Sequence, residues 1–121
     1  MGKIMFIDDD AMVLRMAGFI MKKSDDQILT ADCGKQGIAD ARKEQPDIIF
    51  VDAEMPETDG FEVIRRLKAD SVTAGIPVYM MSGTVTDKII AEAKELGAAD
   101  IVEKPLNAAM ILDIIKNTGG N

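Results

Sequence analysis

The chain has 121 residues, a hydrophobic content of 47%, a charged content of 29% and a formal net charge of -7. These values fit one globular domain with a single core, and the acidic balance argues against a nucleic-acid-binding surface. The chain has no histidine and one cysteine, Cys33, which excludes histidine-dependent catalysis, nearly every zinc site and an internal disulfide.

Three further expectations concern location and Cys33. No apolar run approaches the roughly 20 residues needed to cross a bilayer, so no membrane association is expected. The start, MGKIMF, lacks the long apolar segment and cleavage site of a signal peptide, and we therefore expect a cytoplasmic protein. Cys33 is predicted to be a small apolar filler of the core.

Five short apolar runs predict strands, at residues 4–7, 27–31, 48–51, 77–81 and 100–103. A segment with helical spacing follows each run, and the second segment is the least regular because CGKQGIADARKEQ holds two glycines and few large apolar residues. Strand and helix thus alternate five times. This alternation predicts an α/β fold, a five-stranded parallel doubly wound sheet covered on both faces.

The helical segments carry apolar faces and end signals. Asp10, Thr86 and Asn107 are predicted to cap helix starts, and Gly97 to end the fourth helix in a left-handed conformation. The predicted buried faces comprise Val13, Met16, Ala17 and Ile20 in the first helix, Phe61, Ile64 and Leu67 in the third, Ile89, Ile90, Ala93 and Leu96 in the fourth, and Met110, Ile111, Ile114 and Ile115 in the fifth.

No internal linker or low-complexity segment divides the chain. Residues 1–121 are therefore predicted to form a single domain, with a core over about 3–117 and a tail at 118–121.

Polar and charged residues follow the predicted strands. Asp8 and Asp9 come after the first strand, and Asp52 comes after the third. Ligands of an open parallel sheet bind beyond the carboxyl ends of its strands, so these three carboxylates converge if the first and third strands are neighbours. A pocket of oxygen ligands without histidine suits Mg²⁺. The sequence therefore predicts a magnesium site.

The remaining groups at the strand ends fit phosphoryl transfer. Asp52 is the natural nucleophile, because a carboxylate can form an acyl phosphate. Lys104, after the fifth strand, supplies a positive charge for a phosphoryl oxygen, and Ser82, at the end of the fourth, supplies a hydrogen bond. In such chemistry the protein contributes mainly positioning and charge neutralisation.

Four motifs, IDDD, IIFVDAEMPETDG, MMSGT and EKP, stand in this order on successive strand ends. Together they resemble the receiver domain of two-component response regulators, over about residues 3–117. The resemblance implies a (βα)5 flavodoxin-like fold with strand order 2-1-3-4-5 and a cis Lys104–Pro105 bond. It also implies a phosphorylated switch protein that catalyses only its own phosphorylation and dephosphorylation, and is not otherwise an enzyme.

The resemblance also assigns roles to individual residues. Asp52 would accept a phosphoryl group from a phosphohistidine on a sensor histidine kinase or phosphotransfer protein. The backbone carbonyl of Glu54 would join Asp8, Asp9 and Asp52 around Mg²⁺. Ser82 would be the switch hydroxyl and Lys104 the partner of the phosphoryl group. The partner of the modified state would be a downstream output protein or domain.

One position departs from the family pattern. Ile101, three residues before the lysine, stands where the family usually carries Tyr or Phe. No aromatic ring can rotate inward there. The switch then works through backbone and aliphatic repacking, or its coupling to the output is weak or unusual.

Two other functions are compatible with parts of the sequence. Haloacid-dehalogenase-type phosphatases open with a strand ending in Asp-x-Asp, here Asp8 and Asp10. Those enzymes use the first Asp as the nucleophile. They also need a later acidic pair, and only one acidic residue, Asp113, is present at the corresponding place. A degenerate receiver would bind partners without being phosphorylated, and Ile101 is the one feature in its favour.

The chain is compatible with a stand-alone regulator and with a receiver excised from a longer protein.

Overall fold

Strands and helices alternate along residues 2–119, the part of the chain that the computed structural model describes. Every predicted strand is present, with ends within one residue of the prediction. The elements are β1 (Lys3–Ile7), α1 (Ala11–Met21), β2 (Gln27–Ala31), α2 (Gly34–Glu44), β3 (Ile48–Asp52), α3 (Gly60–Ala69), β4 (Val78–Ser82), α4 (Asp87–Leu96), β5 (Asp100–Glu103) and α5 (Ala108–Gly119).

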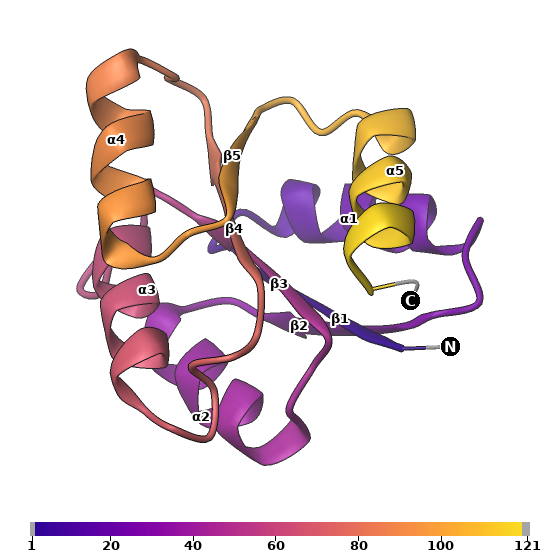
Figure 1. The fold of residues 1–121 in the computed structure, drawn as a ribbon. Coiled ribbons are helices and arrows are strands. Elements are labelled where there is room, and N and C mark those ends of the chain that lie inside the picture. Colours follow the sequence, from indigo (N-terminus) through magenta and orange to yellow (C-terminus); the bar gives the residue numbers. More distant parts are fainter. Residues whose placement is uncertain (1, 120–121) are drawn as a thin grey trace.

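The strands form one parallel sheet in the order β2-β1-β3-β4-β5, which confirms the predicted fold class and strand order. The helices α2, α3 and α4 cover one face of the sheet, and α1 and α5 cover the other (Figure 1). Because the strands are parallel, all their carboxyl ends lie at one edge of the sheet. No helix within residues 2–119 has both the length and the apolar character needed to span a membrane.

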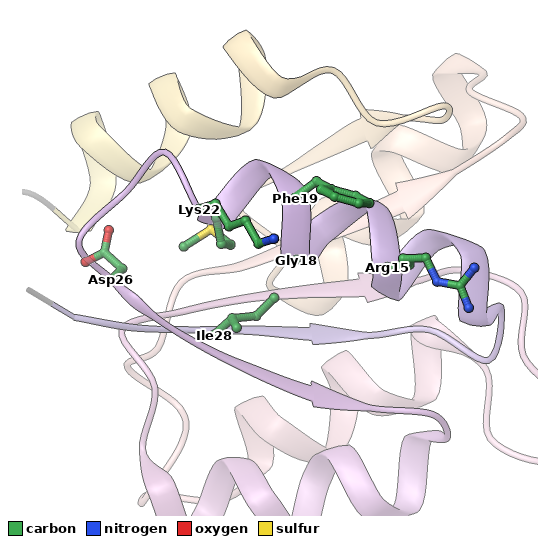
Figure 2. Close-up of a pocket in the computed structure, with 7 residues that line it drawn as sticks. Arg15, Gly18, Phe19, Lys22, Asp26 and Ile28 are labelled. Atoms are coloured by element: carbon green, nitrogen blue, oxygen red, sulfur yellow. The ribbon is translucent and has the colours of Figure 1, made fainter.

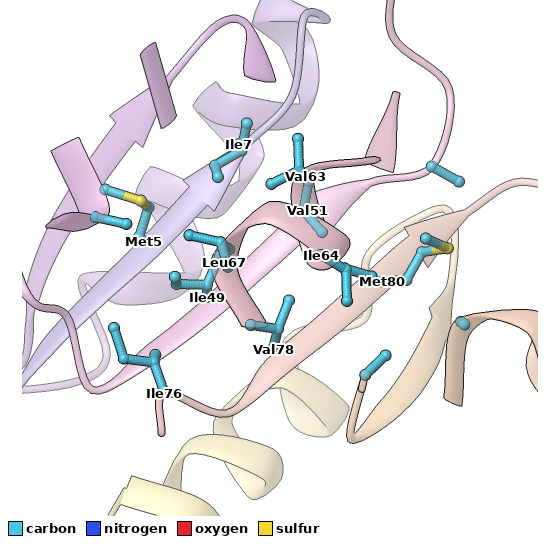
Figure 3. Packing of buried hydrophobic residues seen from close by; sticks show 14 of the residues in the cluster. Met5, Ile7, Ile49, Val51, Val63, Ile64, Leu67, Ile76, Val78 and Met80 are labelled. Carbon is cyan, nitrogen blue, oxygen red and sulfur yellow. The ribbon is translucent and has the colours of Figure 1, made fainter. Parts of the chain in front are cut away.

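Alternate residues of the central strand β3 point to opposite faces and build two cores. Ile49 and Val51 pack under α2, α3 and α4, in the cluster shown in Figure 3. Ile48 and Phe50 pack under α1 and α5, where the Phe50 ring stacks on the ring of Phe6 at a centroid distance of 4.9 Å. All of β3 is buried, as expected for the middle strand of a doubly covered sheet.

The predicted helix ends are confirmed. The Asp10 carboxylate accepts a hydrogen bond from the Met12 N–H, the Thr86 hydroxyl accepts one from the Ile89 N–H, and the Asn107 side chain accepts one from the Met110 N–H. Gly97 follows α4 with φ 113°, in the left-handed region.

Two predictions about burial are wrong. Cys33 is exposed, because the chain leaves the core after the buried Ala31 and turns outward to begin α2. Met16 and Met110 lie on predicted buried faces, yet their exposed fractions are 48% and 50%. The core contacts of α1 are made by Ala17, Ile20 and Met21, and those of α5 by Ile111 and Ile115, so the rest of each apolar face remains in solvent.

The predicted tail differs from the structure at its first residues. The helix α5 continues through residues 118 and 119, and the Thr118 hydroxyl is hydrogen-bonded to the Tyr79 hydroxyl at 2.8 Å. This bond joins the last turn of α5 to β4. Residues 120 and 121 of the predicted tail lie outside the described residues.

The glycines of α2 have a packing explanation. A Cβ built on Gly37 would lie 2.5 Å from Cδ1 and 2.8 Å from Cγ1 of Ile7, a fully buried residue of β1. The helix therefore sits against the sheet at a distance that only glycine allows. The irregular second segment of the sequence reflects this close packing.

We expect Gly37→Ala to destabilise the fold by about 1–3 kcal/mol, because the added methyl group overpacks the site around Ile7. The matched control is Gly18→Ala in α1, where a Cβ would meet nothing within 4 Å. That substitution should stabilise the fold by about 0.5–1 kcal/mol through helix propensity alone. Urea unfolding of the two variants checks the difference. Equal effects of the two substitutions would contradict the packing explanation.

Candidate functional site

Polar residues from four strands meet at the carboxyl edge of the sheet. Asp8 directly follows β1, Asp52 and Ser82 end β3 and β4, and Lys104 directly follows β5. The parallel pairing of β1 with β3 brings together the two acidic strand ends, as the sequence predicted. The backbone N–H of Lys104 donates to the Ser82 carbonyl at 2.8 Å, which ties the two remaining ends together.

Three carboxylates converge at this edge. Asp8, Asp9 and Asp52 each offer one oxygen, and these oxygens all lie within 4.8 Å of one another. Asp8 is fully buried and Asp52 has an exposed fraction of 4%, whereas Asp9 is exposed. Like charges this close repel by roughly 4 kcal/mol at an effective dielectric constant near 20, so the arrangement requires a cation.

Lys104 provides one positive charge. Its ammonium nitrogen lies 2.8 Å from Asp8 Oδ2 and donates a hydrogen bond to Asp52 Oδ1 at 2.9 Å. The peptide bond between Lys104 and Pro105 is cis, as the resemblance implied. One lysine therefore bridges the buried carboxylates of two adjacent strands and leaves this group of charges net negative.

The pKa shifts follow from this setting. Burial raises the pKa of Asp52, the hydrogen bond from Lys104 opposes the rise, and the charge of Asp8 adds to it, so that the net direction is upward. Burial lowers the pKa of Lys104, but the two carboxylates more than offset this and raise it. Desolvation thus disfavours the charged form of Asp52. A further cation beside the carboxylate would favour the charged form again.

The donor atoms fit a magnesium ion. Asp8 Oδ1 accepts a hydrogen bond from the Asp10 N–H at 2.9 Å, which orients the carboxylate. Asp8 Oδ2 is buried, and its one polar partner among the described residues is the Lys104 ammonium group, 2.8 Å away. An under-satisfied buried oxygen beside two more carboxylates is a donor set suited to a hard cation.

Glu54 has a different place in the loop after β3. Its side chain is exposed, and its backbone N–H acts to lower the pKa of the Asp52 carboxylate, against the effect of burial. The role of its carbonyl as a metal ligand stays a prediction from the resemblance.

The hydroxyl of Ser82 is engaged within its own loop. It donates to the Thr84 carbonyl at 2.7 Å and accepts from the Thr84 N–H at 3.1 Å. The backbone of Thr84 is thus a partner of Ser82 that the sequence analysis missed. The local Ser-Gly-Thr sequence could have indicated it, because a serine hydroxyl often bonds the backbone two residues on.

Ile101 lies in β5, paired with Met80 of β4, and packs half-buried against the cluster under α2, α3 and α4. The Ile101 side chain therefore belongs to the aliphatic packing at the margin of this core cluster. It connects β5 with β4, the strand that ends in Ser82.

The first turn of α3 packs directly on the end of β3. The Gly60 N–H donates to the Ala53 carbonyl at 3.0 Å, and a Cβ on Gly60 would lie 2.8 Å from Ala53 Cα. The Ala53 N–H in turn donates to the Met81 carbonyl at 2.8 Å. This contact requires glycine at position 60 and holds the backbone immediately after Asp52.

The geometry disfavours the phosphatase alternative. Asp10, the second acidic residue of the Asp-x-Asp motif, is exposed and caps α1 with its carboxylate. The converging carboxylates are those of Asp8, Asp9 and Asp52 instead. Asp113 lies exposed on α5.

Known proteins share both the sequence pattern and the fold. The sequence profile of the response regulator receiver domain matches residues 4–116. The chain is 33% identical over 117 residues to Protein PilH of Pseudomonas aeruginosa, with 95% of each chain covered. The solved structure of the chemotaxis protein CheY4 of Vibrio cholerae superposes with a TM-score of 0.91 at 25% identity, over 98% of both chains.

Other relatives are longer. The chain is 35% identical to the DNA-binding dual master transcriptional regulator RpaA of Synechocystis sp., with 93% of this chain covered. It spans 46% of RpaA, about half of that protein's length.

In metal-free buffer we expect Asp52→Asn to unfold at a higher temperature than the wild type, because the substitution removes a desolvated charge. The folded-state pKa of Asp52 is above its ordinary 3.8, so the gain is absent below pH 3.8, grows as the pH rises from there to the folded-state pKa, and stays constant above it. A gain of about 1 kcal/mol corresponds to roughly 3–5 °C for a domain of this size.

Asp10→Asn is the matched control, since it removes the same charge outside the three converging carboxylates and keeps an oxygen that can cap α1. Adding Mg²⁺ should raise the unfolding temperature of the wild type and of Asp10→Asn, and leave Asp52→Asn nearly unchanged. Equal stabilisation of all three by Mg²⁺ would rule out a site built on Asp52.

Proposed function

The chain belongs to the response regulator receiver domain family, and on that premise we propose that it is a Mg²⁺-dependent phosphoacceptor in two-component signalling. Asp52 takes the phosphoryl group from a phosphohistidine of a sensor histidine kinase or phosphotransfer protein. The observation that carries this proposal is the pairing of Lys104 with both Asp8 and Asp52 in a pocket of oxygen donors.

The acceptor chemistry follows from the positions of these groups. An oxygen of Asp52 forms a bond to phosphorus while the bond from phosphorus to the donor imidazole nitrogen breaks. Lys104 is already at the carboxylate and balances negative charge on the transferred group. Asp8, Asp9 and Asp52 would hold Mg²⁺, with the Glu54 carbonyl as a further ligand; when bound, the ion neutralises charge on the carboxylates and the phosphoryl oxygens.

The response to phosphorylation is proposed to begin at Ser82. Its hydroxyl exchanges its bonds with the Thr84 backbone for one to a phosphoryl oxygen, which releases the loop after β4. Ile101 transmits this change through aliphatic packing between β4 and β5. The population of conformations shifts, and a downstream output protein or domain recognises the altered surface.

Acetyl phosphate with Mg²⁺ should add one phosphoryl group to the wild-type chain, seen by intact mass and on Phos-tag gels. Asp52→Asn should remove the labelling, and Asp8→Asn should reduce it strongly because a metal-binding carboxylate is lost. Labelling that survives Asp52→Asn and vanishes with Asp8→Asn would favour phosphatase-like chemistry. A wild type that no donor labels would indicate a degenerate receiver.

Ile101→Ala should be labelled by acetyl phosphate as fast as the wild type, because the side chain packs in the core cluster and contributes no polar or charged group to the acceptor pocket. Its phosphorylated form should show a smaller change in hydrogen exchange in α4 and the loop before it. Val102→Ala is the matched control, since Val102 is the next residue and packs against the opposite face of the sheet. If the two variants respond alike, Ile101 has no particular role in transmission.

A further inference from the structure

The sheet has two edge strands, β2 and β5, and their free edges differ. The edge of β5 is closed by its own residues. The Ile101 N–H donates a hydrogen bond to Asp100 Oδ1 at 2.8 Å, and the charged side chains of Asp100 and Glu103 stand at the two ends of the strand. Charged residues on an edge strand oppose pairing with another chain. The edge of β5 is therefore protected against the addition of a further strand.

The free edge of β2, which we call the β2 edge, has no such protection. The strand QILTA holds no charged residue and no proline, and it pairs with β1 through consecutive residues without a bulge. The Gln27 N–H and the Ala31 carbonyl are hydrogen-bonded on the β1 side. Because backbone groups alternate in direction along a strand, those of Ile28 and Thr30 point to the β2 edge. Within residues 2–119 no hydrogen bond reaches these groups.

A hollow lies beside the β2 edge, between α1 and β2 (Figure 2). Phe19 of α1 and Ile28 of β2 give it apolar walls. Phe19 has an exposed fraction of 58%, and Ile28 is half-buried, so both retain apolar surface that a partner could cover. A strand added at the β2 edge would thus find apolar contacts for a side chain on the α1 face of the sheet.

Gly18 keeps this hollow open. It lies in the middle of α1, where glycine weakens a helix, and it lines the hollow. Nothing in this fold requires it, because a Cβ at this position would meet no atom within 4 Å. Gly37 differs, since the packing of Ile7 explains it. The missing side chain at position 18 preserves space beside the β2 edge.

The unpaired charge in the hollow is positive. Arg15 and Lys22 line it, and neither makes an ion pair in the described part of the chain. The Asp26 carboxylate lines it too, but it already accepts hydrogen bonds from the Gly2 N–H and the Ser24 hydroxyl. A carboxylate on the partner would complement the two free cations.

We propose that the β2 edge is a docking surface for an extended segment of a partner protein, which adds a further strand to the sheet. One residue of the segment places an apolar side chain in the hollow. Residues two positions away share its face and carry carboxylates toward Arg15 and Lys22. The outward backbone groups of Ile28 and Thr30 supply hydrogen bonds, and the hollow selects the side chains. This interaction is separate from phosphoryl transfer at Asp52.

A second copy of the chain is a poorer occupant. Its own β2 is preceded by Asp25 and Asp26 and followed by Asp32. A two-fold axis would pair two β2 strands antiparallel and place Asp26 of one copy near Asp32 of the other. Like charges opposite each other destabilise a strand pair. The flanking charges therefore favour a segment of a different protein.

The test uses a capped peptide, Thr-Glu-Thr-Ile-Thr-Glu-Thr, as the probe. Its sequence reads the same in both directions, so it suits parallel and antiparallel pairing alike. The control peptide carries lysine in place of both glutamates. Each is titrated to millimolar concentration into the isotope-labelled chain. The glutamate peptide should shift the backbone amide NMR signals of Ile28 and Thr30, slow their hydrogen exchange, and bind at least about tenfold more tightly than the lysine peptide.

Thr30→Pro tests the backbone pairing. It removes an N–H that points to the β2 edge, and proline is tolerated on an edge strand where the N–H faces solvent, so the bonds between β2 and β1 should remain. This variant should weaken binding of the glutamate peptide at least about tenfold. Thr30→Ala keeps the N–H and should bind as the wild type does. An amide spectrum unchanged outside β2 shows that Thr30→Pro is folded.

Two further variants test the hollow. The charge reversal Arg15→Glu with Lys22→Glu should make the chain prefer the lysine peptide, whereas Lys116→Glu on α5 should leave the preference for the glutamate peptide unchanged. Gly18→Leu fills the hollow and should weaken binding, yet leave the unfolding temperature equal or higher, because the added side chain begins in open space.

Three results would overturn the proposal. The first is no shift at Ile28 and Thr30 with millimolar glutamate peptide. The second is shifts at Arg15 and Lys22 that Thr30→Pro leaves unchanged, which would mean charge attraction without strand addition. The third is concentration-dependent protection of the Ile28 and Thr30 amides in the absence of peptide, which would make a second copy of the chain the occupant.

Discussion

The ammonium group of Lys104 lies between the carboxylates of Asp8 and Asp52, and the function proposed for the chain depends on this contact. The sheet buries both carboxylates, so neither could keep its charge at this edge without a nearby cation. One lysine does not balance three acidic groups, counting Asp9. The unmodified site is therefore an electrostatically unfavourable arrangement that gains from a divalent cation.

Strand pairing creates this arrangement, and the surrounding backbone keeps it in place. The carboxylates can meet only because β1 and β3 are adjacent and parallel, and Lys104 reaches them from the far edge because β5 lies beyond β4. The close contact of Gly60 with Ala53 and the bond from Lys104 N–H to the Ser82 carbonyl hold the loops on either side. The hydroxyl of Ser82, in contrast, is held only by its own loop, which is the part of the site that can rearrange at least cost.

The proposed response to phosphorylation lies on the β4 and β5 side of the molecule, reached through Ser82 and Ile101. The acceptor strand β3 pairs directly with β4, and β4 pairs with β5, so a change at Asp52 reaches Ser82 and then Ile101 through adjacent strands. This route follows from the strand order of the sheet, which places β4 between the acceptor strand and the edge strand β5.

The sequence by itself determined the order of strands and helices along the chain, the helix caps and the residues of the candidate site. These features depend on local rules: the period of the apolar residues, the capping side chains of Asp10 and Thr86, and the polar residues that end each strand. Strand order came from the resemblance of the motifs to a family, because periodicity alone does not say which strands are neighbours. Tertiary structure decided which parts of each predicted surface are covered. Met16 is exposed because α1 meets the core through Ala17, Ile20 and Met21, and Cys33 is exposed because the chain turns away from the core before α2. The partner of the Ser82 hydroxyl and the bridging position of Lys104 were likewise decided only in three dimensions, since burial and distance depend on elements far apart in the sequence.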